Sequence, residues 1–222
     1  MKIFESIINK NDLVFDVGSN MGSKSETFLN LGAKVIGFEP QIECFEQLIN
    51  KFNGNLNFIG ENIALSNKEG NEIMYKASYH TISSMSKEFI VEAKKERFPS
   101  YNWDNQIIVK TKTLDSVINE YGVPSFIKID VEGYELSVLE GLTRPIECIS
   151  VEFNPELCNS SIECIEYVDK LNDSKSLFNY GYREDDFFKY DNWISKDEII
   201  EYLKSVNDFV FEFGDIYIKK VN

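Results

Sequence analysis

The sequence lacks any long apolar run, has a single histidine, and contains four cysteines with no C-x-x-C pair among them. A membrane-spanning helix needs about 20 consecutive apolar residues, and the apolar stretch within residues 1–12 is too short for a signal peptide. Cysteines inside apolar segments are typical of buried free thiols in a reducing compartment. We therefore expect no transmembrane segment and a cytoplasmic protein.

The sequence also lacks clusters of basic residues and stretches that resemble linkers. Its formal net charge is −14, whereas binding to phosphate groups requires a basic surface. The charge therefore argues against a nucleic-acid partner and against docking on anionic membranes. No Pro/Gly/Ser-rich stretch divides the 222 residues, of which 43% are hydrophobic, so we expect one domain over residues 1–222.

The most informative segment that is present reads VFDVGSNMGSKSETFLNLGAKVIGFEP and predicts a strand, a turn, a helix and a second strand. The nearly all-apolar run 13–17 is typical of a strand that is buried on both faces of a parallel sheet. Gly18 and Gly22 permit a sharp turn that passes close to a ligand. The spacing of Ser23 and Glu26 predicts a capping box at the start of the helix.

Acidic residues stand at the ends of both strands. The second strand, 34–38, is followed by Glu39, which lies 23 residues after Asp16. In a strand–helix–strand unit of this kind, an acidic residue about 20 residues on accepts hydrogen bonds from a ribose. The pattern therefore predicts a pocket for a nucleoside cofactor.

The glycine spacing distinguishes between such cofactors. A dinucleotide site requires G-x-G-x-x-G, but the corresponding positions here are Gly18, Asn20 and Ser23. Asp16 beneath the turn suits an amino-acid ammonium group and would repel a pyrophosphate. The pattern D-x-G-x-N-x-G resembles the first motif of class I S-adenosylmethionine-dependent methyltransferases. A dinucleotide site and a glycine-rich turn without any ligand remain the alternatives.

Helix-like and strand-like segments alternate along the rest of the chain. The patterns predict strands at 56–59, 126–129 and 148–153, a hairpin arm at 208–220, and helices at 41–52, 135–141, 162–180 and 193–206. This alternation predicts an α/β fold with a Rossmann-like, doubly wound, mostly parallel seven-stranded sheet and helices on both faces.

Two insertions interrupt the alternation. Residues 71–112 contain candidate strands at 72–76 and 106–111 around a helix at 86–97, and residues 182–193 carry aromatic side chains beside acidic ones. Aromatic faces among polar groups suit a sugar-like ligand, although core packing is their commoner role. The first insertion is therefore a candidate lid on the substrate side.

A second motif, KIDVEGYE, occupies residues 128–135. Asp130 ends a strand at the carboxyl edge, where open α/β sheets bind ligands. Together with the D-x-G-x-N-x-G turn, the F-E-P at 38–40 and the T-L-D at 113–115, this motif resembles the FkbM family of methyltransferases over residues 13–155.

The resemblance implies methylation of a hydroxyl on a sugar, glycan or glycosylated natural product, with S-adenosyl-L-methionine as the cofactor. The acceptor would be a small molecule or a glycan, and the sequence sets no oligomeric state. The implied cofactor contacts are Asp16, Gly18, Ser19, Asn20 and Gly22 at the methionine end, Glu39 at the ribose, Asn62 and Ile63 at the adenine, and Asp130 at the methyl-transfer centre. Pro40, next to Glu39, is a further implied contact.

A hydroxyl acceptor needs a group that takes its proton. His80 is the only histidine, and histidine is the usual residue for general-base catalysis near neutral pH. Asp130, Glu132 and Glu135 are the competing candidates. Glu135 has the alternative role of stabilising the N-terminus of its own helix.

A metal ion is the other candidate source of activation. Asp130 ends one strand, while Glu152 and Asn154 stand two residues apart at the end of the next, so their side chains can point the same way. Three hard oxygen ligands would suit Mg²⁺, in an arrangement similar to that of catechol-type O-methyltransferases. The alternative is that Glu152 and Asn154 only hydrogen-bond the neighbouring backbone.

Two functions of other classes are compatible with the same fold. An NAD-type oxidoreductase is disfavoured by Asn20 and Ser23, which replace two glycines of the dinucleotide motif. A non-catalytic nucleoside-binding module is disfavoured by the presence together of Asp16, Glu39 and Asp130.

Overall fold

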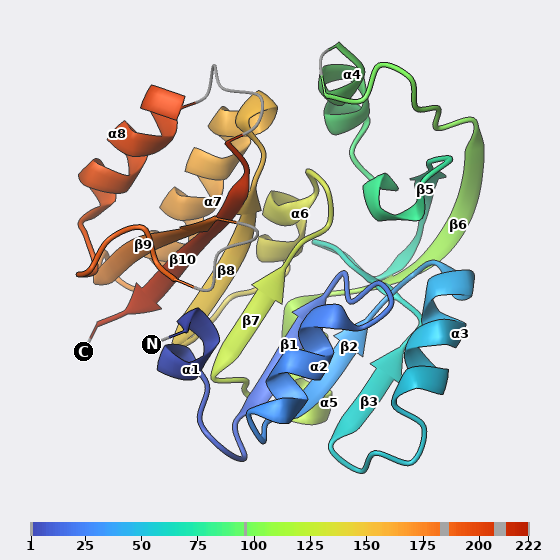
Figure 1. Cartoon of the computed structure of the whole chain (residues 1–222), viewed down its shortest axis with the longest axis horizontal. Helices are drawn as coiled ribbons and strands as arrows, with labels where there is room; N and C mark the ends of the chain where they lie inside the picture. The colour runs from blue at the N-terminus through green and yellow to red at the C-terminus, as the bar shows by residue number, and fades with distance from the viewer. Residues whose placement is uncertain (1, 96, 183–186, 207–211, 222) are drawn as a thin grey trace.

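The computed structural model describes residues 2–95, 97–182, 187–206 and 212–221. Its centre is a seven-stranded sheet in the order β3-β2-β1-β7-β8-β10-β9 (Figure 1). The strands are β1 (Leu13–Val17), β2 (Lys34–Phe38), β3 (Phe58–Glu61), β7 (Phe126–Ile129), β8 (Cys148–Phe153), β9 (Ser176–Tyr182) and β10 (Gly214–Lys220). All of them run parallel except β10, which is antiparallel to both of its neighbours. This is the mostly parallel Rossmann-like sheet that the sequence predicts.

Helices cover both faces of the sheet, because the central strands bury side chains on each face. In β1, Phe15 and Val17 join one core cluster while Val14 joins the other, as the alternation of strand side chains requires. One face is covered by α1 (Ile3–Ile7), α2 (Ser23–Asn30) and α3 (Ile42–Lys51), and the other by α5 (Leu114–Tyr121), α6 (Glu135–Leu139), α7 (Cys158–Leu171) and α8 (Lys196–Val206).

The predicted insertion, residues 71–112, builds a second unit. β5 (Gly70–Lys76) pairs antiparallel with β6 (Asn105–Lys112), and β4 (Ala64–Leu65) completes a three-stranded sheet. α4 (Lys87–Lys95) packs in the same small core as Trp103, whose ring nitrogen donates a hydrogen bond to the Ile82 carbonyl at 2.7 Å. Figure 1 shows this unit beside the carboxyl ends of β1 and β2. The insertion therefore lies next to the edge of the sheet where a ligand is expected.

The predicted helix at 162–180 is wrong in its second half, because α7 ends at Leu171 and β9 follows. Asp173 and Ser174 adopt left-handed backbone angles, with φ of 55° and 58°. The Ser174 amide donates to the Asp169 carbonyl at 2.8 Å, which closes the helix end. Strand β9, which begins at Ser176, pairs with β10 along its whole length. Long-range pairing of this kind overrides local propensity.

Smaller differences concern element ends. The predicted capping box does not form, because α2 begins after Gly22 without a side-chain cap, and the Glu26 carboxylate pairs with Lys51 at 3.0 Å instead. Helices α1 and α5 were not predicted, although Thr113 caps α5 by accepting the Ser116 amide at 3.1 Å. Two predicted segments fall partly outside the described residues, at 183–186 and 208–211.

The cysteines are buried and carry free thiols, as predicted. Burial raises the pKa of Cys44 to about 11 and that of Cys148 to about 12. Within the four described ranges, no helix is both long enough and apolar enough to cross a bilayer.

Candidate functional site

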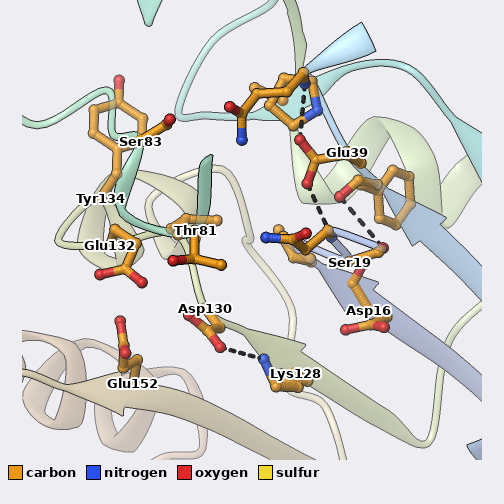
Figure 2. Close-up of a pocket in the computed structure, with 18 of the residues that line it drawn as sticks. Asp16, Ser19, Glu39, Thr81, Ser83, Lys128, Asp130, Glu132, Tyr134 and Glu152 are labelled. Atoms are coloured by element: carbon orange, nitrogen blue, oxygen red, sulfur yellow. Dashed lines mark hydrogen bonds and ion pairs between the residues drawn. The ribbon is translucent and has the colours of Figure 1, made fainter. Parts of the chain in front are cut away.

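A cavity of about 470 Å³ lies at the carboxyl edge of the sheet, between the strand ends and the insertion. Its walls come from the turn after β1, the end of β2, the loop after β7, the insertion, and the facing ends of β8 and β10. The side chains with polar chemistry that line it include Asp16, Ser19, Asn20, Glu39, His80, Thr81, Ser83, Lys128, Asp130, Glu132, Tyr134, Glu152 and Asp215. Figure 2 shows most of them.

The turn after β1 depends on its two glycines. Gly18 has φ of 80°, and a Cβ atom there would stand 1.9 Å from the carbonyl oxygen of Asp130. Gly22 has φ of 79°, and its Cβ would meet the side chains of Phe52 and Leu48 at 2.5 and 2.7 Å. Only glycine fits either position. Gly22 therefore shapes the turn by packing on α3, and it does not itself line the cavity.

Glu39 is held at the end of β2 by backbone amides. One carboxylate oxygen accepts the amide of Asn20 at 2.9 Å and the other accepts the amide of Gln41 at 2.8 Å. Burial raises the pKa of Glu39 to about 7, although both amides favour the ionised form. Each carboxylate oxygen retains a further lone pair. Glu39 can therefore accept hydrogen bonds from two ribose hydroxyls in the cavity.

Asp16 is buried at the base of the turn and lines the same cavity. Its Oδ2 accepts the Ser25 hydroxyl at 2.5 Å, whereas Oδ1 has no hydrogen-bond partner among the residues that the structure describes. Burial raises the pKa of Asp16, and the neighbouring Lys128 opposes that shift. A buried carboxylate oxygen without a donor costs free energy, so this atom fits a ligand that brings a donor such as an ammonium group.

The predicted adenine residues behave differently from each other. Ile63 lines the cavity, as does Pro40. Asn62 does not line it; its side-chain amide donates to the carbonyl oxygens of Glu39 and Pro40 at 2.8 and 3.1 Å. Asn62 thus fixes the backbone that follows β2.

The far end of the cavity contains a buried ion pair. The ammonium group of Lys128 lies 2.8 Å from the Asp130 carboxylate. Burial lowers the pKa of Lys128, but the negative charges of Asp130, Asp215 and Asp16 outweigh it, and the pKa lies above its ordinary value. Lys128 therefore stays protonated and holds these carboxylates near one another.

Three carboxylates meet beside this ion pair. Oxygens of Asp130, Glu132 and Glu152 all lie within 4.8 Å of one another, and Figure 2 shows the Glu132 and Glu152 carboxylates pointing toward each other. The third predicted metal ligand, Asn154, is turned elsewhere. Its amide donates to Glu152 at 2.9 Å, and its oxygen accepts from Arg97 at 2.7 Å. Glu132, and not Asn154, is therefore the third member of the group of convergent oxygen ligands.

Of the candidate bases, some line the cavity and one does not. His80, at the start of the short 3₁₀ turn His80–Ile82, lines the cavity, and its Nδ1 makes no hydrogen bond within the described part of the chain. Glu135 lies behind the cavity wall, where one oxygen accepts the amides of Val131 and Gly133 at 3.0 and 3.1 Å. Burial raises its pKa to about 7. The prediction that Glu135 is a catalytic group therefore has no support in the geometry, because its carboxyl group hydrogen-bonds the backbone of the loop after β7.

Sequence reasoning missed three groups in the cavity. Lys128 lies inside the KIDVEGYE motif, but nothing in the motif reveals that its ammonium group is buried. Asp215 lies opposite Glu152 in the β10–β8 register, and only the pairing of those strands brings it to the site. The aromatic Tyr134 lines the cavity as well, with its hydroxyl donating to Glu72 of the insertion at 2.8 Å.

A parallel α/β sheet with a glycine turn, an acid at the end of each of its first two strands and a cavity above them has the architecture of class I methyltransferases. The chain belongs to the FkbM methyltransferase family, because the model of the methyltransferase FkbM domain matches residues 16–211. The match extends well past residue 155, where the motifs recognised in the sequence end.

Individual relatives are distant. The hexuronic acid methyltransferase AglP of Haloferax volcanii is 26% identical over 144 residues, which cover 64% of this chain and 54% of that protein. The chain therefore matches about half the length of this curated relative. The precorrin-6y C5,15-methyltransferase of Geobacter metallireducens superposes with a TM-score of 0.50 at 9% identity, covering 97% of this chain and 85% of that one. A putative methyltransferase of Streptococcus mutans in complex with SAH superposes with a TM-score of 0.46 at 11% identity, covering 98% of this chain and 93% of that one. These structural likenesses concern the fold alone.

Proposed function

We propose that the chain is an S-adenosylmethionine-dependent O-methyltransferase that acts on a hydroxyl of a sugar, a glycan or a glycosylated natural product. The observation that carries this proposal is the division of one cavity into two ends. One end offers Asp16 and Glu39 beside the glycine turn, and the other offers Asp130 with Glu132 and Glu152. A cofactor end and an acceptor end are what a group transfer requires.

The polar and apolar groups at the cofactor end match those of S-adenosylmethionine. The Oδ1 of Asp16, which has no hydrogen-bond partner among the described residues, suits the ammonium group, and Glu39 suits the ribose hydroxyls. Pro40 and Ile63 offer apolar contacts for the adenine. When bound, the cofactor supplies a methyl group on a positively charged sulfur, which needs little further activation.

The acceptor end must hold a hydroxyl group in line and take its proton. Asp130, Glu132 and Glu152 can accept hydrogen bonds from neighbouring hydroxyls of a sugar ring. Thr81, Ser83 and Tyr134 add neutral polar groups to the same end. The proton is accepted by a carboxylate of this group or by His80, which reaches the cavity from the insertion.

We include a divalent cation at the acceptor end as an optional part of the proposal. The three convergent carboxylates match the hard oxygen ligands that Mg²⁺ prefers, and Glu132 replaces the predicted Asn154 in the set. The cation would lower the pKa of an acceptor hydroxyl.

The alternative of an NAD-type oxidoreductase makes the opposite prediction about ligands. Asp16 in the cavity would repel a pyrophosphate, so we expect S-adenosylhomocysteine to bind and NAD not to bind. Calorimetric titration with both compounds decides between the two, and binding of NAD alone would refute the methyltransferase. A non-catalytic module would bind S-adenosylhomocysteine but transfer no methyl group.

The decisive experiment for the activity is a transfer assay. The protein is incubated with S-adenosylmethionine carrying a labelled methyl group and with a panel of neutral sugars, hexuronic acids, nucleotide sugars and glycans. The hexuronic acids are included because the Haloferax volcanii relative carries that substrate in its name. We expect label in at least one carbohydrate product, in a bond that resists mild base as an ether does. Label found only in base-labile methyl esters of the hexuronic acids would contradict methylation of a hydroxyl.

We infer a reducing, cytoplasmic compartment for this activity. The four cysteines are buried as free thiols, which supports such a setting.

A further inference from the structure

Arg97 is a buried cation that the methyl-transfer chemistry does not use. It follows α4 in the insertion, and its side chain is 8% exposed. Its guanidinium donates to the side-chain oxygen of Asn154 at 2.7 Å. It also lies 3.1 Å from a carboxylate oxygen of Glu156 and 4.0 Å from one of Glu132. Each of these three partners lies beyond the carboxyl end of β7 or β8, outside the insertion.

Aromatic rings enclose the same guanidinium. Its central carbon lies 4.7 Å from the ring centre of Phe98, 5.8 Å from that of Phe89 and 5.7 Å from that of Phe213. Phe89 and Phe98 belong to the insertion, whereas Phe213 precedes Gly214, which lines the cavity. Ring faces attract a cation more strongly when water is excluded. Arg97 therefore joins the insertion to the ends of three strands of the main sheet.

The contacts of Arg97 lead directly to two carboxylates of the acceptor end. One is Glu132 itself. The other is Glu152, because the Asn154 amide that bonds to Arg97 also donates to Glu152 at 2.9 Å. A second tether runs in parallel, since the Ser84 hydroxyl of the insertion donates to the Glu132 carbonyl at 2.6 Å. The side chains that would hold the acceptor thus depend on where the insertion sits.

We propose that Arg97 is the positioning residue that docks the insertion on the sheet and orients Glu132 and Glu152 toward the acceptor. The inference rests on the proposed function, because it takes the acceptor end as the place of methyl transfer. An arginine suits the task, because its planar, fork-shaped guanidinium can face several oxygen-bearing groups at once and stays charged when buried. Lysine keeps the charge but not the fork, so it should replace arginine only in part.

The test compares Arg97→Gln and Arg97→Lys with a matched control, Arg144→Gln. Arg144 also lies beside an asparagine and a carboxylate, 3.2 Å from Asn119 and 3.4 Å from Asp115, but it is more exposed and neither of these partners lines the cavity. Each variant is measured for S-adenosylhomocysteine affinity by calorimetry, for backbone hydrogen exchange, and for kcat and KM with the acceptor found in the panel.

We expect Arg97→Gln to keep its S-adenosylhomocysteine affinity within about threefold, because the cofactor end is untouched. Its kcat/KM for the acceptor should fall at least about tenfold, a loss that corresponds to about 1.4 kcal/mol. Hydrogen exchange should rise in residues 79–95 and 130–134 but not in β1 and β2. Arg97→Lys should lie between wild type and Arg97→Gln, and Arg144→Gln should match wild type.

Two results would overturn the role of Arg97. One is an acceptor kcat/KM in Arg97→Gln equal to that of wild type. The other is an equal loss of cofactor affinity and turnover, which indicates a general folding defect. Failure of the proposed function is seen separately, as wild-type protein that methylates nothing in the panel. In that case the exchange of residues 130–134 still decides the docking, and an unchanged rate there rejects it.

Discussion

At the scale of single residues, Glu39 shows how burial and function oppose each other. Its carboxyl group has a pKa raised to about 7 by burial, while the ribose hydroxyls that we propose as its ligands donate hydrogen bonds to the ionised form. Ligand binding must therefore remove a proton at acid pH. This makes the affinity for the cofactor sensitive to pH in a range where ordinary glutamates are already ionised.

The first prediction is a pH dependence of cofactor affinity. Between pH 6 and pH 8, a group with a pKa of about 7 goes from mostly protonated to mostly ionised, so S-adenosylhomocysteine should bind about tenfold more tightly at pH 8. Glu39→Gln should bind more weakly and lose most of this dependence. Calorimetry at three pH values provides the measurement, with Glu26→Gln on the exposed surface as the control. A wild-type affinity that is flat over this range would contradict the proposed role.

The second prediction separates a metal from a histidine. If Asp130, Glu132 and Glu152 hold Mg²⁺, EDTA should abolish turnover, added Mg²⁺ should restore it, and Glu152→Ala should lose turnover while still binding S-adenosylhomocysteine. If His80 is the base, EDTA should have no effect and His80→Ala should cut kcat by about a hundredfold to ten-thousandfold. Full activity of Asp130→Ala would refute both versions, since each places that carboxylate beside the reacting groups.

At the scale of elements, the sequence predicted the segments whose pattern is local. The run 13–17 reads as a doubly buried strand because its side chains pack on both faces, and β1 does so. Segment 176–182 lacks such a local signature. It becomes β9 through its pairing with β10, a contact between residues 32 to 44 positions apart that no local pattern contains. The same limit applies to the site, where strand-end acids were predictable but Asp215 and Arg97 were not.

The third prediction concerns the loop between β7 and α6. Glu135 satisfies two amides of this loop, so Glu135→Ala should lower the free energy of unfolding by roughly 2–6 kcal/mol, since each buried amide without a partner costs about 1–3 kcal/mol. Glu135→Gln should lose much less, because its amide oxygen still accepts. Denaturant unfolding of both variants at one pH measures the difference.

A pH effect with a defined sign accompanies this loop. Burial raises the pKa of Glu135 in the folded state to about 7, from an ordinary value of 4.5. The folded state thus binds the extra proton, and its contribution to stability falls as pH rises from about 4.5 to about 7. Glu135→Gln should therefore show a shallower decline of stability over this window than wild type. An identical slope in both proteins would show that Glu135 does not titrate there.

At the scale of the whole molecule, the fold buries reactive groups that the surface does not reveal. The four thiols lie inside this structure, and burial raises the pKa of each of them. Thiolates, not thiols, react with disulfide reagents. We predict very slow reaction of the native protein with such a reagent and four fast thiols per chain in denaturant. Fast reaction of even one thiol in the native state would contradict the burial described.

Lys128 couples the two ends of the cavity electrostatically, because carboxylates from both ends act on its charge. This lysine lies beside Asp16 in the β1–β7 register and pairs with Asp130, so one positive charge is shared between the cofactor end and the acceptor end. Removing either carboxylate leaves the lysine more strongly bound to the other. The effects of Asp16→Asn and Asp130→Asn on stability should therefore not add, and a double-mutant cycle should show coupling of roughly 0.5–3 kcal/mol. A substitution of Asp16 at the cofactor end therefore also changes the environment of Asp130 at the acceptor end, through the lysine that lies beside both.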